Sequence, residues 1–555
     1  MSGGKAVIEK LKKENVNIVF GLIGSATMEL FDALYYEKKI RFIDVRDERT
    51  GTHMADGYAR ASGKPGIIIA GQNGPGATNL VTGVAQAKAA FSPVISIAGA
   101  ITNEHKGKDA FQEIDQQSLF EPITKKTFTV NKTHLIPQIL NKAFSLAQTL
   151  RQGPVHINLP RDVLSSNHKF TDFYSSKIKN FPKINQKDIK KIFNLITLSK
   201  KPVIVAGGGI KNSEIYFDLI KLANKLNIPI VSSPGHGDAI PFYEPLYAGQ
   251  MGPRGNPIAS NLVKKTDLIL ALGTRLGFNS TFYSYDYISK NAKIIQIEAD
   301  QKSIGRYFPV TIGICNDVKN LVYELNLITQ NNKEIPNYNR WVNDFKKNKN
   351  NYLKKRKKEA DINAIPIKPS GLFEKLRNCI PNNSAITLDA GTLCLQATDM
   401  LNFTEPKSLF TPLDFGLVGF SFACGLGVKL AKPDIPVFSL MGDGGFGMTV
   451  SELSTAVTHN INTITIVMNN KSWGAEKAYQ RDYYNKRYIG SDITSPPFHK
   501  LAELYGAKGY YVDNLSNLEG VIKDALNCKK PSVINIQMDP KALYSFRKDS
   551  FKHKK

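Results

Sequence analysis

The alternation of short apolar runs with helix-like segments is the feature that most constrains this fold. Runs such as "GIIIAG", "PVIVAGGG" and "PVFSLMGDG" have the length and β-branched content of buried strands. That order of elements is typical of parallel sheets covered by helices. It occurs in three blocks, which predicts three α/β domains, each doubly wound around a mostly parallel sheet, over residues 1–165, 186–330 and 365–545. Two polar stretches, the second of them basic and rich in Asn, connect the blocks.

Composition narrows the class of protein. The 555 residues contain no apolar run of about 18, so we expect no membrane span. The five cysteines are scattered without metal-ligand spacing, and the first residues lack a signal peptide's apolar stretch, so we expect a reduced, cytoplasmic setting. The net charge is +25, but outside Phe345–Glu359 and the last residues the lysines are spread along the chain. We therefore expect no nucleic-acid partner, and an electrostatic preference for small anionic substrates.

Polar motifs follow two neighbouring predicted strands in the third block. "GDGG" follows the apolar run "IPVFSLM", and "NN" follows Thr463–Val467, with a predicted helix over Thr449–His459 between them. Because both strands of a βαβ unit end at the same sheet edge, where ligands bind, we expect Asp443 and Asn470 to lie close together. A carboxylate, an amide oxygen and a backbone carbonyl, placed at Ser472, suit Mg²⁺ or Ca²⁺. The neighbouring glycines leave room for diphosphate oxygens.

This motif, "GDG" followed by 24 residues and "NN", resembles the thiamine diphosphate motif of the acetolactate synthase and pyruvate decarboxylase superfamily. The resemblance implies a pyrimidine-binding first domain, a central domain and a diphosphate-binding third domain. It also implies that Asp443, Asn470 and the Ser472 carbonyl hold Mg²⁺. By the same match, further residues belong to the cofactor site: Gly444, Gly445 and Trp473.

A glutamate in the first block matches the catalytic glutamate of that family. The stretch "RFIDVRDERTGTHMADGYAR" places Glu48 after a predicted strand and at the start of a predicted helix. In the family this glutamate bonds a pyrimidine nitrogen of the cofactor and promotes the tautomer that activates it. Asp47 stands where the family commonly has His, so the resemblance implies that no His at that position shuttles protons.

Two more segments of the first block are similar to family loops near the reacting carbon. "GQNGPGATN" resembles the glycine loop beside the active site, with Asn73 where acetolactate synthases usually carry Ser. "DAFQEIDQQ" resembles the segment that would place Gln112 near the reacting carbon.

In the third block, "DAGTLC" and "DFGLVGF" resemble the diphosphate and aminopyrimidine loops. Gly391 and Thr392 would then lie by the diphosphate, and the Gly416 carbonyl would accept a hydrogen bond from the amino group. Val418 would take the place of the apolar residue, usually Met, that bends the cofactor.

The segment after the metal motif indicates a substrate. "WGAEKAYQRDYYNKRYIG" and the late "FRKD" are similar to segments of the sulfoacetaldehyde acetyltransferases, which cleave the C–S bond of sulfoacetaldehyde, release sulfite and transfer acetyl to phosphate. Sulfonate and phosphate require fixed cations, for which Arg487 and Arg547 are candidates, with Asn73 also on the substrate side. Glu476 is a candidate proton relay. The "VRDERTGT" region and the shorter tail depart from that subfamily's pattern.

Other activities stay open. One is an acetolactate synthase-like carboligase or decarboxylase of 2-oxo acids, and another is a 2-hydroxyacyl-CoA or oxalyl-CoA lyase. Central-block loops such as "AGGGIKN" resemble the corresponding loops of flavin-binding acetolactate synthases, so FAD or ADP in this block stays an open alternative. However, "RLGF" lacks the acidic residues that follow Arg in the flavin-binding enzymes. A non-catalytic paralogue is disfavoured because Glu48, Asp443 and Asn470 are all present.

The resemblance also predicts the assembly. In this family the glutamate domain of one subunit meets the diphosphate domain of another, so we expect a homodimer or homotetramer.

Overall fold

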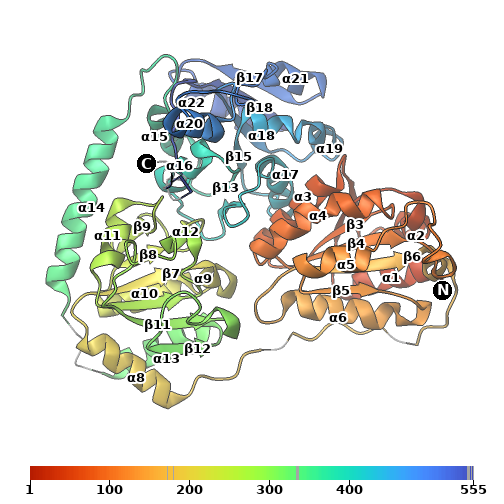
Figure 1. The fold of residues 1–555 in the computed structure, drawn as a ribbon, viewed down its shortest axis with the longest axis horizontal. Helices are drawn as coiled ribbons and strands as arrows, with labels where there is room; N and C mark the ends of the chain where they lie inside the picture. The colour runs from red at the N-terminus through yellow and green to blue at the C-terminus, as the bar shows by residue number, and fades with distance from the viewer. Residues whose placement is uncertain (172, 179, 333–336, 547–549, 552, 554–555) are drawn as a thin grey trace.

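The computed structural model describes residues 1–555 apart from 172, 179, 333–336, 547–549, 552 and 554–555. That part of the chain contains three six-stranded sheets whose strands pair in parallel. Helices surround each sheet (Figure 1), so the predicted α/β class with three doubly wound domains is confirmed. No helix among the described residues is both long enough and apolar enough to cross a bilayer.

The first domain, red to orange in Figure 1, has the strand order β2-β1-β3-β4-β6-β5. Its strands are β1 (Ile18–Leu22), β2 (Arg41–Asp44), β3 (Gly66–Ala70), β4 (Val94–Ala100), β5 (Lys126–Thr129) and β6 (Val155–Pro160). Its helices are α1 (Gly3–Lys13), α2 (Met28–Tyr35), α3 (Glu48–Ser62), α4 (Pro75–Ala89), α5 (Gln116–Phe120), α6 (Ile136–Gln148) and α7 (Arg161–Ser165).

The central domain has the order β12-β11-β10-β7-β8-β9. Its strands are β7 (Pro202–Ala206), β8 (Ile230–Ser232), β9 (Tyr247–Gln250), β10 (Leu268–Leu272), β11 (Lys293–Glu298) and β12 (Ile312–Cys315). Its helices are α8 (Gln186–Leu198), α9 (Gly208–Ser213), α10 (Tyr216–Leu226), α11 (Pro257–Lys265), α12 (Phe278–Thr281) and α13 (Val318–Asn331).

The third domain has the order β14-β13-β15-β16-β18-β17. Its strands are β13 (Ala385–Leu388), β14 (Leu409–Phe410), β15 (Val437–Gly442), β16 (Ile464–Asn469), β17 (Lys508–Val512) and β18 (Ser532–Gln537). Its helices are α15 (Pro369–Cys379), α16 (Thr392–Met400), α17 (Ser421–Ala431), α18 (Asp443–Gly447), α19 (Leu453–Thr458), α20 (Gly474–Tyr483), α21 (Phe498–Leu504) and α22 (Leu518–Asn527).

The predicted helix over Thr449–His459 is wrong in its extent. The glycine-rich motif itself turns directly into α18, a 3₁₀ turn follows at Val450–Glu452, and only Leu453–Thr458 is α-helical. Thr449 interrupts the helical path because its backbone φ of −133° lies outside the helical region.

The first and third domains share a core through α3 and α17. Asp47 caps α3 at its start, and Gly63, with a left-handed φ of 74°, ends it. A Cβ on Gly57 would lie 2.3 Å from the Cys424 carbonyl oxygen, and one on Gly427 would lie 1.9 Å from that of Met54. Glycine therefore allows the two helices to cross in close contact.

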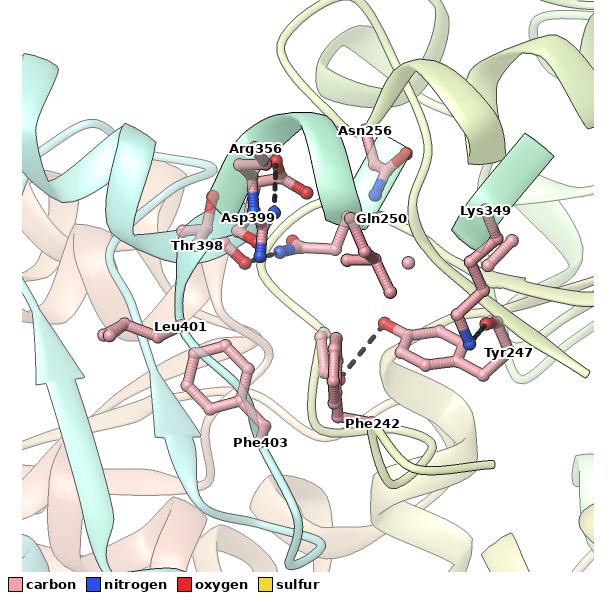
Figure 2. Close-up of a pocket in the computed structure, with 14 residues that line it drawn as sticks. Phe242, Tyr247, Gln250, Asn256, Lys349, Arg356, Thr398, Asp399, Leu401 and Phe403 are labelled. Atoms are coloured by element: carbon pink, nitrogen blue, oxygen red, sulfur yellow. Dashed lines mark hydrogen bonds and ion pairs between the residues drawn. The ribbon is translucent and has the colours of Figure 1, made fainter. Parts of the chain in front are cut away.

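The basic connector between the central and third domains forms one long helix, α14 (Asn339–Glu359), at the edge of the molecule in Figure 1. Figure 2 shows how it is held: Arg356 pairs with Asp399, and Lys349 Nζ donates to the Tyr247 carbonyl at 2.6 Å. Burial lowers the pKa of Lys349 to about 8. The pocket between these residues measures about 30 Å³, which is room for about two water molecules. This region is therefore a joint between domains.

Candidate active site

Glu48 is fixed within the first domain by residues of α4. Its side chain is buried, and its Oε2 accepts a hydrogen bond from Asn79 Nδ2 at 3.0 Å. A Cβ on Gly76 would lie 3.1 Å from Glu48 Oε1, so a larger residue there would crowd the carboxyl. Burial raises the pKa of Glu48, although the bond from Asn79 opposes the shift. A carboxyl of raised pKa at a sheet edge can share a proton with a ring nitrogen.

Asn73 and Gln112 lie together at the same edge of the first sheet. Asn73 Nδ2 donates to the Gln112 carbonyl at 3.1 Å and to the Phe111 carbonyl at 3.3 Å. Gln112 has a left-handed φ of 63°, and its Oε1 accepts a hydrogen bond from Gln72. The amide nitrogen of Asn73 therefore holds the segment that carries Gln112.

The two polar motifs of the third domain meet as the strand pattern predicts. Gly442 at the end of β15 pairs with Met468 of β16, so both motifs leave the sheet at one edge. Asp443 is buried, and the backbone N–H of Asn470 is among the groups that stabilise its carboxylate. Burial is the larger effect and raises the pKa of Asp443. Asn470 Oδ1 in turn accepts a hydrogen bond from the Ser472 amide at 3.3 Å.

Asp389 organises the loop that carries Gly416 and Val418. Its carboxylate accepts hydrogen bonds from the amides of Gly419 at 2.9 Å and Phe420 at 2.7 Å. A Cβ on Gly445 would lie 2.2 Å from Asp389 Oδ2 and 3.3 Å from Val418 Cγ1. This loop therefore packs directly on the glycines that follow Asp443.

Two other glycines of this half-site have backbone conformations that favour glycine. Gly391 has a φ of 112° and Gly416 a φ of 76°, and a Cβ on either would point into open space. Thr392 begins α16 after Gly391. A Cβ on Gly474 would lie 3.0 Å from Asn470 Nδ2 and 3.5 Å from Thr392 Oγ1, so Thr392 and the Asn motif are neighbours.

The predicted substrate segment starts at this half-site. The Trp473 ring packs on the glycine loop, since a Cβ on Gly444 would lie 2.6 Å from it. Glu476, in the first turn of α20, is exposed, and so is Arg487 in the loop that follows. Arg547 lies outside the described residues, but Ser545 just before it donates to Asp482 at 2.6 Å, so this end of the chain runs beside α20.

Opposite sides of α3 face different domains. Glu48 and Thr52 are on the side that contacts α4: a Cβ on Gly83 would lie 2.4 Å from Thr52 Cβ. Thr50 donates to Glu452 of the third domain. Residues two positions apart on a helix point about 200° apart. The Glu48 carboxyl therefore faces α4 of the first domain, on the side of α3 opposite the contact between Thr50 and Glu452.

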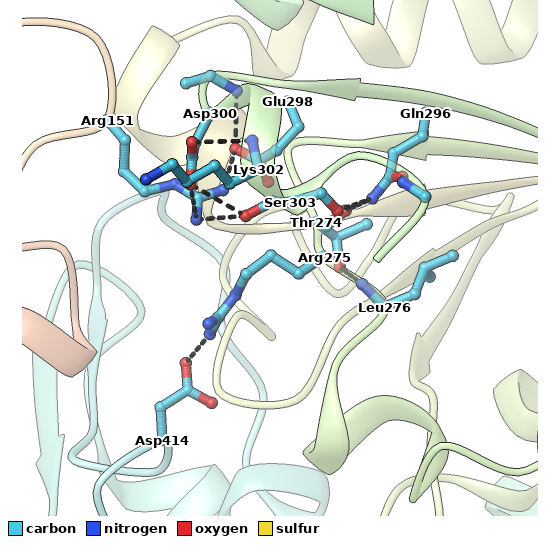
Figure 3. A network of polar contacts seen from close by, with 12 residues as sticks. Arg151, Thr274, Arg275, Leu276, Gln296, Glu298, Asp300, Lys302, Ser303 and Asp414 are labelled. Carbon is cyan, nitrogen blue, oxygen red and sulfur yellow. Dashed lines mark hydrogen bonds and ion pairs between the residues drawn. The ribbon is translucent and has the colours of Figure 1, made fainter. Parts of the chain in front are cut away.

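A large cavity lies where the three domains meet, at the carboxyl ends of β7, β10 and β11. Its volume is about 810 Å³. Arg151, Glu298, Arg275 and Asp414 line it and belong to the polar network in Figure 3, in which Arg151 of the first domain contacts Glu298 at 2.6 Å and Asp300 at 3.3 Å, and Arg275 contacts Asp414 at 3.1 Å. These ion pairs join each outer domain to the central one.

Three models of thiamine pyrophosphate enzyme domains match this chain in order. The N-terminal TPP binding domain matches residues 1–119, the central domain residues 189–325 and the C-terminal TPP binding domain residues 389–536. A probable acetolactate synthase large subunit of Methanococcus aeolicus is 35% identical over 98% of this chain and 93% of its own. The chain belongs to the thiamine pyrophosphate enzyme family.

Two further family members show how the identities divide between activities. The acetolactate synthase large subunit of Haemophilus influenzae is 34% identical over 97% of this chain and 95% of its own. The sulfoacetaldehyde acetyltransferase of Castellaniella defragrans is 31% identical over 99% of this chain and 95% of its own. The protein is thus an enzyme that depends on thiamine pyrophosphate, which is thiamine diphosphate, and its relatives carry out at least two reactions.

The third domain of this thiamine pyrophosphate enzyme fits a diphosphate and a divalent cation. Asp443 Oδ1 is buried and, among the described residues, accepts no hydrogen bond. A buried carboxylate oxygen without a hydrogen-bond donor is suited to bind a cation. A Cβ on Gly442 would meet nothing within 4 Å, and the same holds at Gly391, so ligand oxygens can approach the backbone at both positions. Asp443, Asn470 and the Ser472 carbonyl are the groups that could hold such a cation here.

Three further residues of this site have roles that the sequence pattern does not reveal. Asn79 and Asp389 lie within motifs that the resemblance covers, and their packing roles appear only when their partners are known. Ser495, which donates to Asp443 Oδ2 at 2.5 Å, lies 52 positions away in a loop without local signal.

Proposed function

We propose that this enzyme cleaves the C–S bond of sulfoacetaldehyde and transfers the acetyl group to phosphate, giving acetyl phosphate and sulfite. The observation that carries the proposal is the position of the segment similar to sulfoacetaldehyde acetyltransferases. Its Trp473 packs on the glycine loop beside Asp443, and α20 begins at the next residue. The segment that distinguishes this subfamily therefore starts at the metal motif, where it can act on the substrate.

The chain's own residues have the chemistry that this reaction needs. Thiamine diphosphate, when bound, would supply a nucleophilic carbon and a sink for negative charge. Glu48 offers a carboxyl of raised pKa to the pyrimidine nitrogen. The Gly416 carbonyl would accept a hydrogen bond from the cofactor's amino group, and Val418, which lies against Gly445, would support its ring.

Around the substrate, Gln112 and Asn73 contribute amides from the first domain. Arg487 and Arg547 are proposed to bind the sulfonate and phosphate, because guanidinium groups match tetrahedral oxyanions. Glu476, exposed on the first turn of α20, is proposed to relay protons.

A second activity is supported by the relatives themselves. Two acetolactate synthase large subunits are 35% and 34% identical to this chain, and the sulfoacetaldehyde acetyltransferase is 31% identical to it. An acetolactate synthase-like carboligase or decarboxylase of 2-oxo acids is therefore the alternative, followed by a 2-hydroxyacyl-CoA or oxalyl-CoA lyase.

One panel separates these activities. Purified protein with thiamine diphosphate and Mg²⁺ is given sulfoacetaldehyde with and without phosphate, and acetyl phosphate and sulfite are measured. Equimolar release of both, dependent on phosphate, supports the proposal. Carbon dioxide and acetolactate from pyruvate, or acyl-CoA products from the CoA substrates, with no sulfite from sulfoacetaldehyde, would replace it with the corresponding alternative.

We also propose a homodimer or a homotetramer in which two copies complete each site. The Glu48 carboxyl bonds to Asn79 of α4, on the side of α3 opposite Thr50 and its third-domain partner Glu452. Exposed apolar side chains flank both half-sites: Phe111, beside Gln112, is 83% exposed, and Phe415, beside Gly416, is 48% exposed. A second copy would cover them. A monomeric mass by light scattering, for a sample with full activity, would refute this assembly.

The three-domain cavity is the place we propose for FAD or ADP, should the enzyme bind either. Arg60 and Lys211 line its wall, where each is already paired with an aspartate, Asp56 and Asp238, so a bound phosphate would have to share these cations. Heat-released supernatant analysed by chromatography would show flavin or adenine nucleotide. If neither flavin nor adenine nucleotide is released after reconstitution with both compounds, this part of the proposal is wrong.

A further inference from the structure

The chain after α20 returns to the metal motif and pairs with it. Ser472 and Asp492 form an antiparallel bridge, flanked by hydrogen bonds from the Trp473 amide to the Ser491 carbonyl at 2.8 Å and from the Ile493 amide to the Lys471 carbonyl at 3.1 Å. Residues 471–473 and 491–493 thus close the excursion that contains α20 at its base.

At the end of this return, Ser495 contacts the other strand's motif. Its Oγ donates to Asp443 Oδ2 at 2.5 Å, while Asp443 Oδ1 is buried and accepts no hydrogen bond from any described residue. Oδ2 therefore accepts a hydrogen bond from Ser495, whereas Oδ1 remains available to a ligand. A carboxylate can rotate about its Cβ–Cγ bond, and a hydrogen bond to one oxygen restricts that rotation.

We propose that Ser495 is a positioning residue for the metal site, which holds Asp443 so that Oδ1 is presented to the cation. The inference rests on the proposed role of Asp443 as a metal ligand. It adds a connection: the segment that bears Glu476 and Arg487 is anchored to the metal motif at both ends, by Trp473 and by Ser495. Residues that orient a metal ligand in this way typically change metal affinity by 10- to 100-fold when removed.

The decisive comparison is Ser495→Thr against Ser495→Val, because these side chains share a shape and differ in the hydroxyl. Thr494→Ala is the matched control, since the Thr494 side chain is exposed next to Ser495. Mn²⁺ is titrated into each variant with saturating thiamine diphosphate, and free Mn²⁺ is followed by electron paramagnetic resonance. A second readout is Trp473 fluorescence in a Trp341→Phe background, because the chain has two tryptophans.

We expect Ser495→Thr and Thr494→Ala to bind Mn²⁺ like the parent, and Ser495→Val to raise the Kd about tenfold. Equal Kd values for Ser495→Thr and Ser495→Val would overturn the role of Ser495. Asp443→Ala, measured in parallel, distinguishes the proposed metal site from the proposed role of Ser495. Loss of saturable Mn²⁺ binding in Asp443→Ala supports Asp443 as a metal ligand. Parental binding in that variant would overturn both the metal site and the role of Ser495.

Discussion

Glu48 and Thr50 lie two positions apart on α3 and bind residues of different domains. The Glu48 carboxyl accepts a hydrogen bond from Asn79 within the first domain, while the Thr50 hydroxyl donates to Glu452 of the third. Thr50 and Glu452 are both buried, so this contact fixes the rotation of α3 about its axis. We propose that a glutamate held in this direction serves the diphosphate site of another copy of the chain.

Mixing two inactive variants tests that arrangement. Coexpressed Glu48→Gln and Asp443→Ala chains form mixed dimers in which one of the two sites has both native residues. With random pairing we expect about a quarter of the parental activity, since half of the dimers are mixed and each has one intact site. Each variant alone is the control. Activity no higher than that of the separate variants would show that Glu48 and Asp443 act within one chain.

Glu48→Gln is expected to lower kcat by about 10²- to 10⁴-fold, because an amide cannot exchange a proton with the pyrimidine nitrogen. The Kd for thiamine diphosphate, measured by fluorescence titration, should change little. Asp47→Asn is a matched control, because Asn also caps a helix and should leave α3 and the activity intact. Parental kcat in Glu48→Gln would remove this residue from the mechanism.

Asp443→Ala and Asn470→Ala are each expected to abolish saturable binding of thiamine diphosphate with Mg²⁺ up to millimolar concentrations. The carboxylate and the amide oxygen lie where β15 and β16 end together, and the described residues contain no cluster of three or more His, Cys, Asp or Glu side chains that could hold a metal instead. Isothermal titration calorimetry measures the affinity. If the double variant bound the cofactor as tightly as the parent, the assignment of this site would be wrong.

Gly445→Ala is expected to lower the free energy of unfolding by about 1–3 kcal/mol and to weaken cofactor binding. The added methyl would lie 2.2 Å from Asp389 Oδ2 and would displace the loop that bears Val418. At Gly447, two residues on, the nearest atom would be 4.0 Å away, so Gly447→Ala should unfold at the parental temperature or slightly above. Equal thermal midpoints for the two variants would contradict the close contact.

Acid should destabilise the junction of α3 and α17 through His53. This histidine is fully buried against Phe420, and burial, followed by the charge of Arg49, lowers its pKa from 6.5 to about 3. Below pH 6.5 the unfolded chain binds a proton that the folded chain does not, so the free energy of unfolding falls as the pH drops from 6.5 towards 3. At pH 5 the loss is about 2 kcal/mol.

Urea unfolding of the parent and of His53→Gln at pH 7 and pH 5 measures this effect. The variant should lose about 2 kcal/mol less than the parent between the two pH values, because other titrating groups cancel in the comparison. An identical pH dependence would show that His53 does not titrate as proposed.

Much of the fold follows from local pattern. Runs such as Gly66–Ala70 and Val203–Ala206 are buried on both faces of parallel sheets, which requires the unbroken apolar sequences they have. The predicted extent of the helix after "GDGG" was wrong, because the periodicity of apolar residues does not reveal a single residue, Thr449, whose backbone is not helical.

The sequence by itself determined the three parallel sheets and the meeting of Asp443 with Asn470, because strands that run the same way in one βαβ unit must end at the same edge. Only the tertiary structure decided which side of α3 faces the third domain and which loop returns to Asp443. Thr50 with Glu452, and Ser495 with Asp443, are pairs separated by hundreds or tens of residues. Such contacts arise from the packing of finished elements, for which neither periodicity nor spacing carries a signal.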